Sequence, residues 1–126
     1  MREAIKVGVI ADQTGALSPL GGAQANTATL VVDEINASGG LLGHHVELLI
    51  EDSATDDGRA AAAAAKLVHD DHVDVVLGGI FSSTRQAIKE PAVVEGETLY
   101  IYPEQYEGQE HHPLLLIFST VSPQSA

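Results

Sequence analysis

An α/β fold with a parallel sheet covered by helices on both faces is what this 126-residue sequence predicts. Two observations support this prediction. Short, mostly apolar segments rich in β-branched residues alternate with longer segments in which apolar residues recur every three or four positions. Strands that are apolar along their whole length are typical of a parallel sheet buried between two layers of helices.

The first half of the chain supplies two strands and one helix. The first strand is expected at residues 5–10, and the loop ADQTGALSPLGG follows it. Helical spacing of apolar residues predicts a helix over residues 23–37, with Val31 on its apolar face, and the SGG sequence after it ends the helix. The second strand is expected at residues 46–50.

The second half continues the alternation. A second helix is expected after Asp56 and Asp57 and contains six consecutive alanines. The third strand is expected at residues 73–77. The third helix begins within SSTRQAIKEPAVVEG, where Ser83 and Gln86 have the spacing of a capping box, and Pro91 should kink or shorten it. The fourth and fifth strands are expected at residues 98–101 and 114–118.

This order of elements predicts a Rossmann-like (flavodoxin-like) sheet. In such sheets ligands bind outside the carboxyl ends of the strands, near a switch in strand order. Four loops lie at those ends: ADQTGALSPLGG, EDSATDDG, GGIFSST and YPEQYEGQE. These loops are therefore the candidate binding site.

The GGIFSST loop is the most informative of the four. Its glycines permit a tight turn, and Ser82, Ser83 and Thr84 lie at the start of the predicted helix. Helix-terminal N–H groups and hydroxyls suit a carboxylate, an amide oxygen or another small polar acceptor. Simple helix capping, which needs only one of the three hydroxyls, explains the sequence equally well.

The YPEQYEGQE loop carries a second group of candidates. Tyr102, Glu104 and Tyr106 could line a pocket, with Glu104 accepting hydrogen bonds from amide or ammonium donors. The alternative for each of them is an acidic surface loop. Their common position at the end of a strand favours a site.

Composition excludes several classes of function. The formal net charge is −12, and Lys and Arg form no cluster, which argues against nucleic acid and anionic membranes as partners. The chain has no cysteine, and its apolar runs are shorter than the roughly 20 residues needed to span a bilayer. His69 and His72 have a spacing that could hold a metal, but a solvated helix end is the favoured interpretation. No spacing indicates a catalytic triad or a carboxylate pair, so neither catalysis nor a cofactor is expected.

Several motifs together resemble a known family. TGALSPLG, DEINASGGLLG and EDSATD, followed by GGIFSSTRQAI, closely resemble the opening of type I periplasmic substrate-binding proteins of branched-chain amino acid transporters. Within that family, STRQAI and YPEQYEGQE look like the urea- and short-chain-amide-binding branch. The resemblance implies that Ser82 contacts the ligand amide and that Ile80 falls where the amide sensor has an aromatic residue. It also implies that Glu104 occupies a variable position facing the ligand.

The resemblance implies a non-enzymatic function. It predicts a periplasmic solute-binding protein that recognises urea, a short-chain amide or a branched-chain amino acid and serves an ABC permease. The alternative is a cytoplasmic amide-sensing regulator of an amidase operon. Residues 1–126 are expected to form a single N-terminal lobe that ends near the first crossover to a second lobe. Surfaces that the rest of such a protein would cover are expected to make the chain a homo-oligomer.

Overall fold

The computed structural model describes residues 4–104 and 112–117, and its centre is a parallel sheet of five strands. The strand order is β2-β1-β3-β4-β5, and every neighbouring pair is parallel. This confirms the predicted fold class. The strands are β1 (Ala4–Ala11), β2 (His45–Asp52), β3 (Val75–Gly78), β4 (Leu99–Tyr102) and β5 (Leu115–Ile117).

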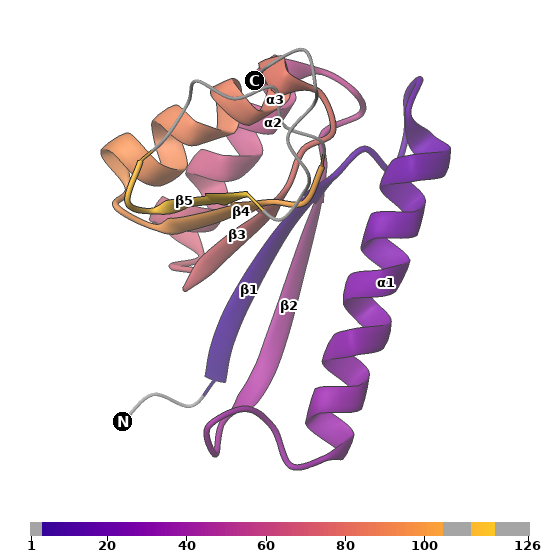
Figure 1. Ribbon diagram of the computed structural model, residues 1–126, viewed down its shortest axis with the longest axis vertical. Helices are drawn as coiled ribbons and strands as arrows, with labels where there is room; N and C mark the ends of the chain where they lie inside the picture. The colour runs from indigo at the N-terminus through magenta and orange to yellow at the C-terminus, as the bar shows by residue number, and fades with distance from the viewer. Residues whose placement is uncertain (1–3, 105–111, 118–126) are drawn as a thin grey trace.

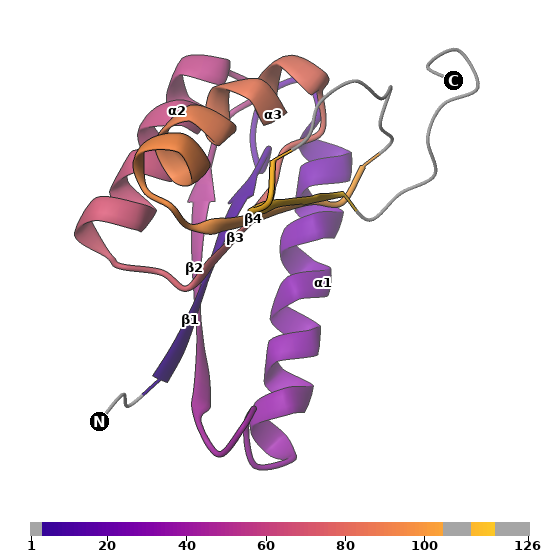
Figure 2. The ribbon, with the colours of Figure 1, turned by 60° about the vertical axis from the view of Figure 1, so that its left-hand side comes forward.

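Helices cover both faces of the sheet, but unequally. Helix α1 (Ser18–Ala37) lies alone on one face, where it packs mainly against β1 and β2 (Figure 1). Helices α2 (Asp57–Ala65) and α3 (Ser82–Lys89) lie together on the other face (Figure 2). Each of these two continues into a short π-helical segment, η1 (Lys66–Asp70) after α2 and η2 (Glu90–Glu95) after α3.

Helix α1 differs from its prediction in the residue at which it begins and in the exposure of one of its apolar residues. It begins at Ser18, five residues before the predicted position, because Pro19 is compatible with the first turn of a helix. Val31 was expected to face the core, yet it is 46% exposed. The reason is that α1 lies over β1 and β2, so the flank that carries Val31 points past them toward β3.

The third helix also begins earlier than its capping-box pattern indicates. Phe81 is the N-cap residue, with extended backbone angles and no side-chain cap hydrogen bond. Ser83 therefore lies inside the first turn, and the predicted capping box with Gln86 is wrong. The effect of Pro91 is confirmed, since the regular helix ends at Lys89 and a π-helical segment carries the proline.

Most of the core lies between the sheet and the α2–α3 layer. Three alanines of α2, Ala60, Ala63 and Ala64, are buried there, and their small side chains allow this helix to approach the sheet and α3 closely. The smaller core under α1 is built around Val9 and Ala25. The second helix starts where predicted, because Asp56 caps it by accepting a hydrogen bond from the Arg59 amide at 3.0 Å.

Two adjacent glycines of α1 should respond oppositely to the same substitution. A Cβ at Gly21 would lie 2.1 Å from the Asp12 carbonyl oxygen, whereas a Cβ at Gly22 would meet nothing within 4 Å. We expect Gly21→Ala to lower the free energy of unfolding by about 1–3 kcal/mol through overpacking. Gly22→Ala should raise it by about 0.5–1 kcal/mol, because alanine loses less backbone entropy in a helix. Urea denaturation of both variants tests this. Stabilisation by Gly21→Ala would show that the close contact between α1 and the Asp12 carbonyl leaves room for a side chain.

Candidate ligand-binding site

The strand order places the candidate site at the carboxyl edge of β1 and β3. Strand β1 lies between β2 and β3, and the chain leaves β1 toward α1 on one face and β3 toward α3 on the other. The connections therefore diverge there, which is where ligands bind in open α/β sheets.

The loop after β3 passes very close to β1. Gly78 has a φ of +140° and Gly79 a φ of +87°, conformations that side chains rarely adopt. A Cβ at Gly78 would lie 2.0 Å from the carbonyl oxygen of Ile10. The paired glycines predicted to allow a tight turn therefore also allow this contact between backbones.

Two buried tyrosines of β4 hold this loop in place. The Tyr100 hydroxyl donates to the Gly78 carbonyl at 2.8 Å, and the Tyr102 hydroxyl donates to the Ile80 carbonyl at 2.6 Å. Tyr100 is fully buried and Tyr102 nearly so. The guanidinium carbon of Arg85, which is also fully buried, lies 4.9 Å from the centre of the Tyr102 ring, a cation–π contact. Strand β4 thus fixes the shape of the β3–α3 loop.

The start of α3 combines exposed and structural hydroxyl groups. Ser82 is half-buried and Ser83 is exposed, and the first turn of the helix contains no acidic residue. Thr84 is buried, and its hydroxyl donates to Asp57 at 2.6 Å, which joins the N-termini of α2 and α3. Thr84 therefore has a structural role, while the two serines lie where a ligand oxygen could be held.

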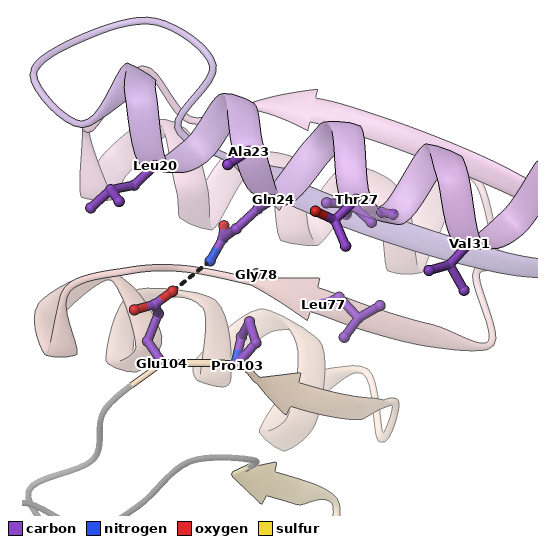
Figure 3. Close-up of a pocket in the computed structure, with 11 residues that line it drawn as sticks. Leu20, Ala23, Gln24, Thr27, Val31, Leu77, Gly78, Pro103 and Glu104 are labelled. Atoms are coloured by element: carbon purple, nitrogen blue, oxygen red, sulfur yellow. Dashed lines mark hydrogen bonds between the residues drawn. The ribbon is translucent and has the colours of Figure 1, made fainter.

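Glu104 extends from the end of β4 toward α1. Its Oε2 atom accepts a hydrogen bond from the Gln24 side-chain amide at 3.1 Å (Figure 3). Both residues line a cavity of about 490 Å³ between α1 and the sheet. Glu104 thus accepts from an amide, the kind of donor predicted for it, but this donor belongs to the protein.

One carboxylate organises the first loop. Asp52, at the end of β2, accepts hydrogen bonds from the Thr14 hydroxyl at 2.6 Å and from the amides of Gln13, Thr14 and Ala54. The Thr14 hydroxyl is the largest cause of a lowered Asp52 pKa, the amides lower it further, and partial burial opposes them. Nearby, the Ser53 hydroxyl donates to the buried Asp12 at 2.8 Å. These contacts join the loops after β1 and β2.

The structure brings some of the predicted site residues together and separates others. Ile80 and Tyr102 share a hydrogen bond, whereas Glu104 faces α1 and Ser82 begins a helix of the opposite layer. Tyr106 lies outside the described residues. Among the described residues no three His, Cys, Asp or Glu side chains gather as a metal site, and His69 and His72 are exposed.

Sequence reasoning did not single out Arg85, Tyr100 or Asp57 as part of this edge. An arginine early in an amphipathic helix is usually a surface residue, so nothing in the local sequence indicated that Arg85 is buried. The LYIY sequence of β4 did carry a signal, because alternate residues of a strand share a face and Tyr100 therefore accompanies Tyr102.

The fold and this edge define a class of open α/β domain, and comparison with known proteins specifies the family. The sequence matches the family described as "Periplasmic binding protein" over residues 4–126. The chain therefore belongs to the periplasmic binding protein family. Within the part of the chain that the structure describes, no helix has the length and apolar character needed to cross a membrane.

Relatives in the family are named as amino acid binding proteins. The chain is 34% identical over 86 residues to the Leu/Ile/Val-binding protein of Escherichia coli K12, covering 68% of this chain and 23% of that protein. It is 33% identical over 99 residues to the Leu/Ile/Val-binding protein BraC3 of Rhizobium johnstonii, covering 79% of this chain and 26% of that protein. The chain thus spans about a quarter of the length of these curated relatives.

A solved structure agrees with this assignment. The branched-chain amino acid transporter substrate binding protein LivJ of Streptococcus pneumoniae, in complex with isoleucine, superposes with a TM-score of 0.84 at 28% identity. The match covers 91% of this chain and 33% of that one. These relatives are binding proteins, not enzymes.

The tyrosine hydroxyls should contribute measurably to stability. We expect Tyr100→Phe to lower the free energy of unfolding by about 1–3 kcal/mol, because it leaves the Gly78 carbonyl without its buried donor. Thr29→Ala also removes a hydroxyl bonded to a carbonyl, but this bond lies within the exposed side of α1 and should cost less. Denaturant unfolding measures the free energy of unfolding of both variants. Equal losses would contradict the expectation that the buried tyrosine hydrogen bond contributes more than the exposed one.

Acid should weaken the first loop through Asp52. Its pKa in the folded protein lies below the usual 3.8, so its contribution to stability is complete at higher pH. The contribution is lost as pH falls through the folded-state pKa. We expect Asp52→Asn to flatten the dependence of unfolding free energy on pH between about pH 5 and pH 3. Thr14→Val, which removes the hydroxyl donor, should flatten it partly, and unchanged slopes in both variants would contradict this role.

Proposed function

We propose that this chain is the N-terminal ligand-binding lobe of a periplasmic solute-binding protein that delivers a small neutral or zwitterionic solute to an ABC permease. The candidate solutes are urea, a short-chain amide and a branched-chain amino acid. Family membership and the names of the amino acid binding relatives support the binding role. The STRQAI and YPEQYEGQE sequences favour the urea and amide candidates.

The observation that carries the proposal is the start of α3. The helix has no side-chain cap at Phe81 and no acidic residue in its first turn, so its N-terminus favours an electron-rich ligand oxygen. Ser82 and Ser83 add hydroxyl donors at the same place. The tyrosines of β4 hold the preceding loop, so these donors are positioned before a ligand arrives. Tyr102 contributes to binding through this positioning.

The charges around this edge favour a ligand that also carries N–H donors. Asp52 ends β2, Asp57 begins α2 and Glu104 follows β4, while Arg85 is buried against the Tyr102 ring. An anion would approach several carboxylates, whereas an amide, urea or ammonium group can donate to them. A carbonyl or carboxylate oxygen at α3, on a ligand that also carries N–H donors, fits both urea-like solutes and amino acids.

One lobe should bind such a ligand only weakly. It supplies one wall of the site, so water continues to compete for each hydrogen bond, while ligand sites in proteins usually bury most of the ligand surface. We expect a dissociation constant above about 1 mM for acetamide or isoleucine, with amide-resonance shifts confined to residues 78–85. Two-dimensional NMR titration measures both the affinity and the position.

Variants and control ligands separate the parts of this proposal. Ser82→Ala should reduce the shifts of the α3 amides, while Ser38→Ala, at the exposed end of α1, should leave them unchanged. Acetate tests the charge argument and should shift the same amides less than acetamide. Larger shifts with isoleucine than with acetamide would assign the amino acid instead of the amide. Micromolar binding by the single lobe, or shifts centred elsewhere, would contradict the proposal.

A further inference from the structure

Asp52, Asp57 and Glu104 flank the candidate site, and of these three only Asp57 hydrogen-bonds to the helix that begins there. Asp52 accepts hydrogen bonds from the loops after β1 and β2, and Glu104 accepts from Gln24 on α1. Asp57, in contrast, accepts the hydroxyl of Thr84 on α3 at 2.6 Å. Asp57 is therefore the acid best placed to act on a ligand at the start of α3.

Thr84 lies in the first turn of α3, so its partner is close to the free amides of that turn. Phe81 is the N-cap residue, and the Arg85 amide donates to the Phe81 carbonyl at 3.0 Å. The amides before Arg85 have no acceptor within the helix, and they give the N-terminus its partial positive charge. The Asp57 carboxylate is one hydroxyl group away from this turn. Its negative charge therefore acts where the partial positive charge is located.

The carboxylate comes from the neighbouring helix, because the first turn of α3 contains no acidic residue. Helices α2 and α3 pack side by side on one face of the sheet (Figures 1 and 2). Each of them follows a parallel strand, so both begin at the carboxyl edge. Asp57 is the first residue of α2, and its bond to Thr84 holds the carboxylate between the two N-termini.

No basic side chain neutralises Asp57. It forms no ion pair with any residue in the described part of the chain, and Arg85 is buried against the Tyr102 ring. A hydrogen bond from a neutral hydroxyl stabilises a carboxylate but leaves its net charge in place. Asp57 is half-buried, and salt screens such a charge less than one in open solvent. A ligand at α3 is therefore exposed to this negative charge.

We propose that Asp57 makes this site reject anions, so that the solute held at α3 carries no net negative charge. The inference rests on the proposed binding of a ligand oxygen at the start of α3. The helix N-terminus attracts the oxygen of a neutral or a charged ligand alike. Asp57 repels a ligand with net negative charge and affects a neutral dipole much less. Helix and carboxylate together select an amide, a urea or a zwitterion over a simple carboxylate or phosphate.

A purely structural role for Asp57 predicts a different result. Asparagine has nearly the same shape, and its side-chain oxygen can still accept the Thr84 hydroxyl, so Asp57→Asn preserves the link between α2 and α3. The variant removes only the charge. If Asp57 only joins the two helices, the relative affinity for anions and neutral ligands should stay the same. If Asp57 sets the selectivity, the affinity for anions should rise.

NMR titration with acetate and acetamide, two probes of nearly equal shape, measures this selectivity. At a constant ionic strength of about 0.15 M, we expect Asp57→Asn to bind acetate about three- to tenfold more tightly than the wild-type chain does. Acetamide should change by less than about twofold. Asp56→Asn is the matched control, because Asp56 is the adjacent acid, is exposed and caps α2 through the Arg59 amide. It removes the same charge, yet should change the acetate affinity by less than about twofold.

Thr84→Val tests the position of Asp57 without changing any charge. It removes the hydroxyl that holds the carboxylate at α3, so Asp57 becomes free to turn toward water. Acetate affinity should therefore rise, by less than in Asp57→Asn. The two-dimensional spectrum of each variant also reports whether its fold is retained.

The possible outcomes separate this inference from the proposed function. Suppose that both ligands shift residues 78–85 and that Asp57→Asn has the same acetate-to-acetamide affinity ratio as the wild-type chain. That result would overturn the inference and leave the binding site in place. An equal gain in acetate affinity from Asp56→Asn would also overturn it, because it would show a general effect of net charge. If neither ligand shifted residues 78–85 of the wild-type chain, the proposed function would fail, and the inference with it.

Discussion

The near contact between the backbones of β1 and the β3–α3 loop is the constraint on which the candidate site depends. Gly78 lies against the Ile10 carbonyl, in a conformation that excludes a side chain. This geometry directs the chain from the centre of the sheet into α3 with little freedom. The hydroxyls of Tyr100 and Tyr102 then satisfy the loop carbonyls that the turn leaves without partners in the sheet. The N-terminus of α3 is therefore positioned by the sheet itself.

The two sides of the carboxyl edge are built by different means. On the α2–α3 side, buried hydroxyl–carbonyl bonds and the Thr84–Asp57 contact join elements distant in sequence. On the α1 side, Asp52 gathers several amides of the first loop, and Glu104 reaches α1 through Gln24. Tyr100 and Tyr102 on the first side are buried, whereas Asp52 and Glu104 on the second are half-buried.

The fold could be predicted because its signals are local. Apolar strands, helical spacing and glycine stops all lie within single elements, and their alternation implies a parallel sheet. The position of the candidate site followed from the same alternation, since every strand ends at one edge. The exposure of Val31 could not be predicted, because helical spacing shows which residues share a face but not how many strands the helix covers. The hydrogen bond of Tyr102 could not be predicted for a similar reason, since its acceptor, the Ile80 carbonyl, is distant in sequence and belongs to the backbone.

The alanines of α2 have a consequence for how freely this sequence can vary. The six alanines are consecutive in the sequence, but the helical period places some of them against the core and turns others toward solvent. Ala60 and Ala64 are fully buried against neighbours, so a larger side chain there would push α2 away from the sheet and α3. Ala62 faces solvent and could be replaced by lysine or glutamate at little cost. A stretch that resembles low complexity therefore contains some of the least replaceable positions of the chain.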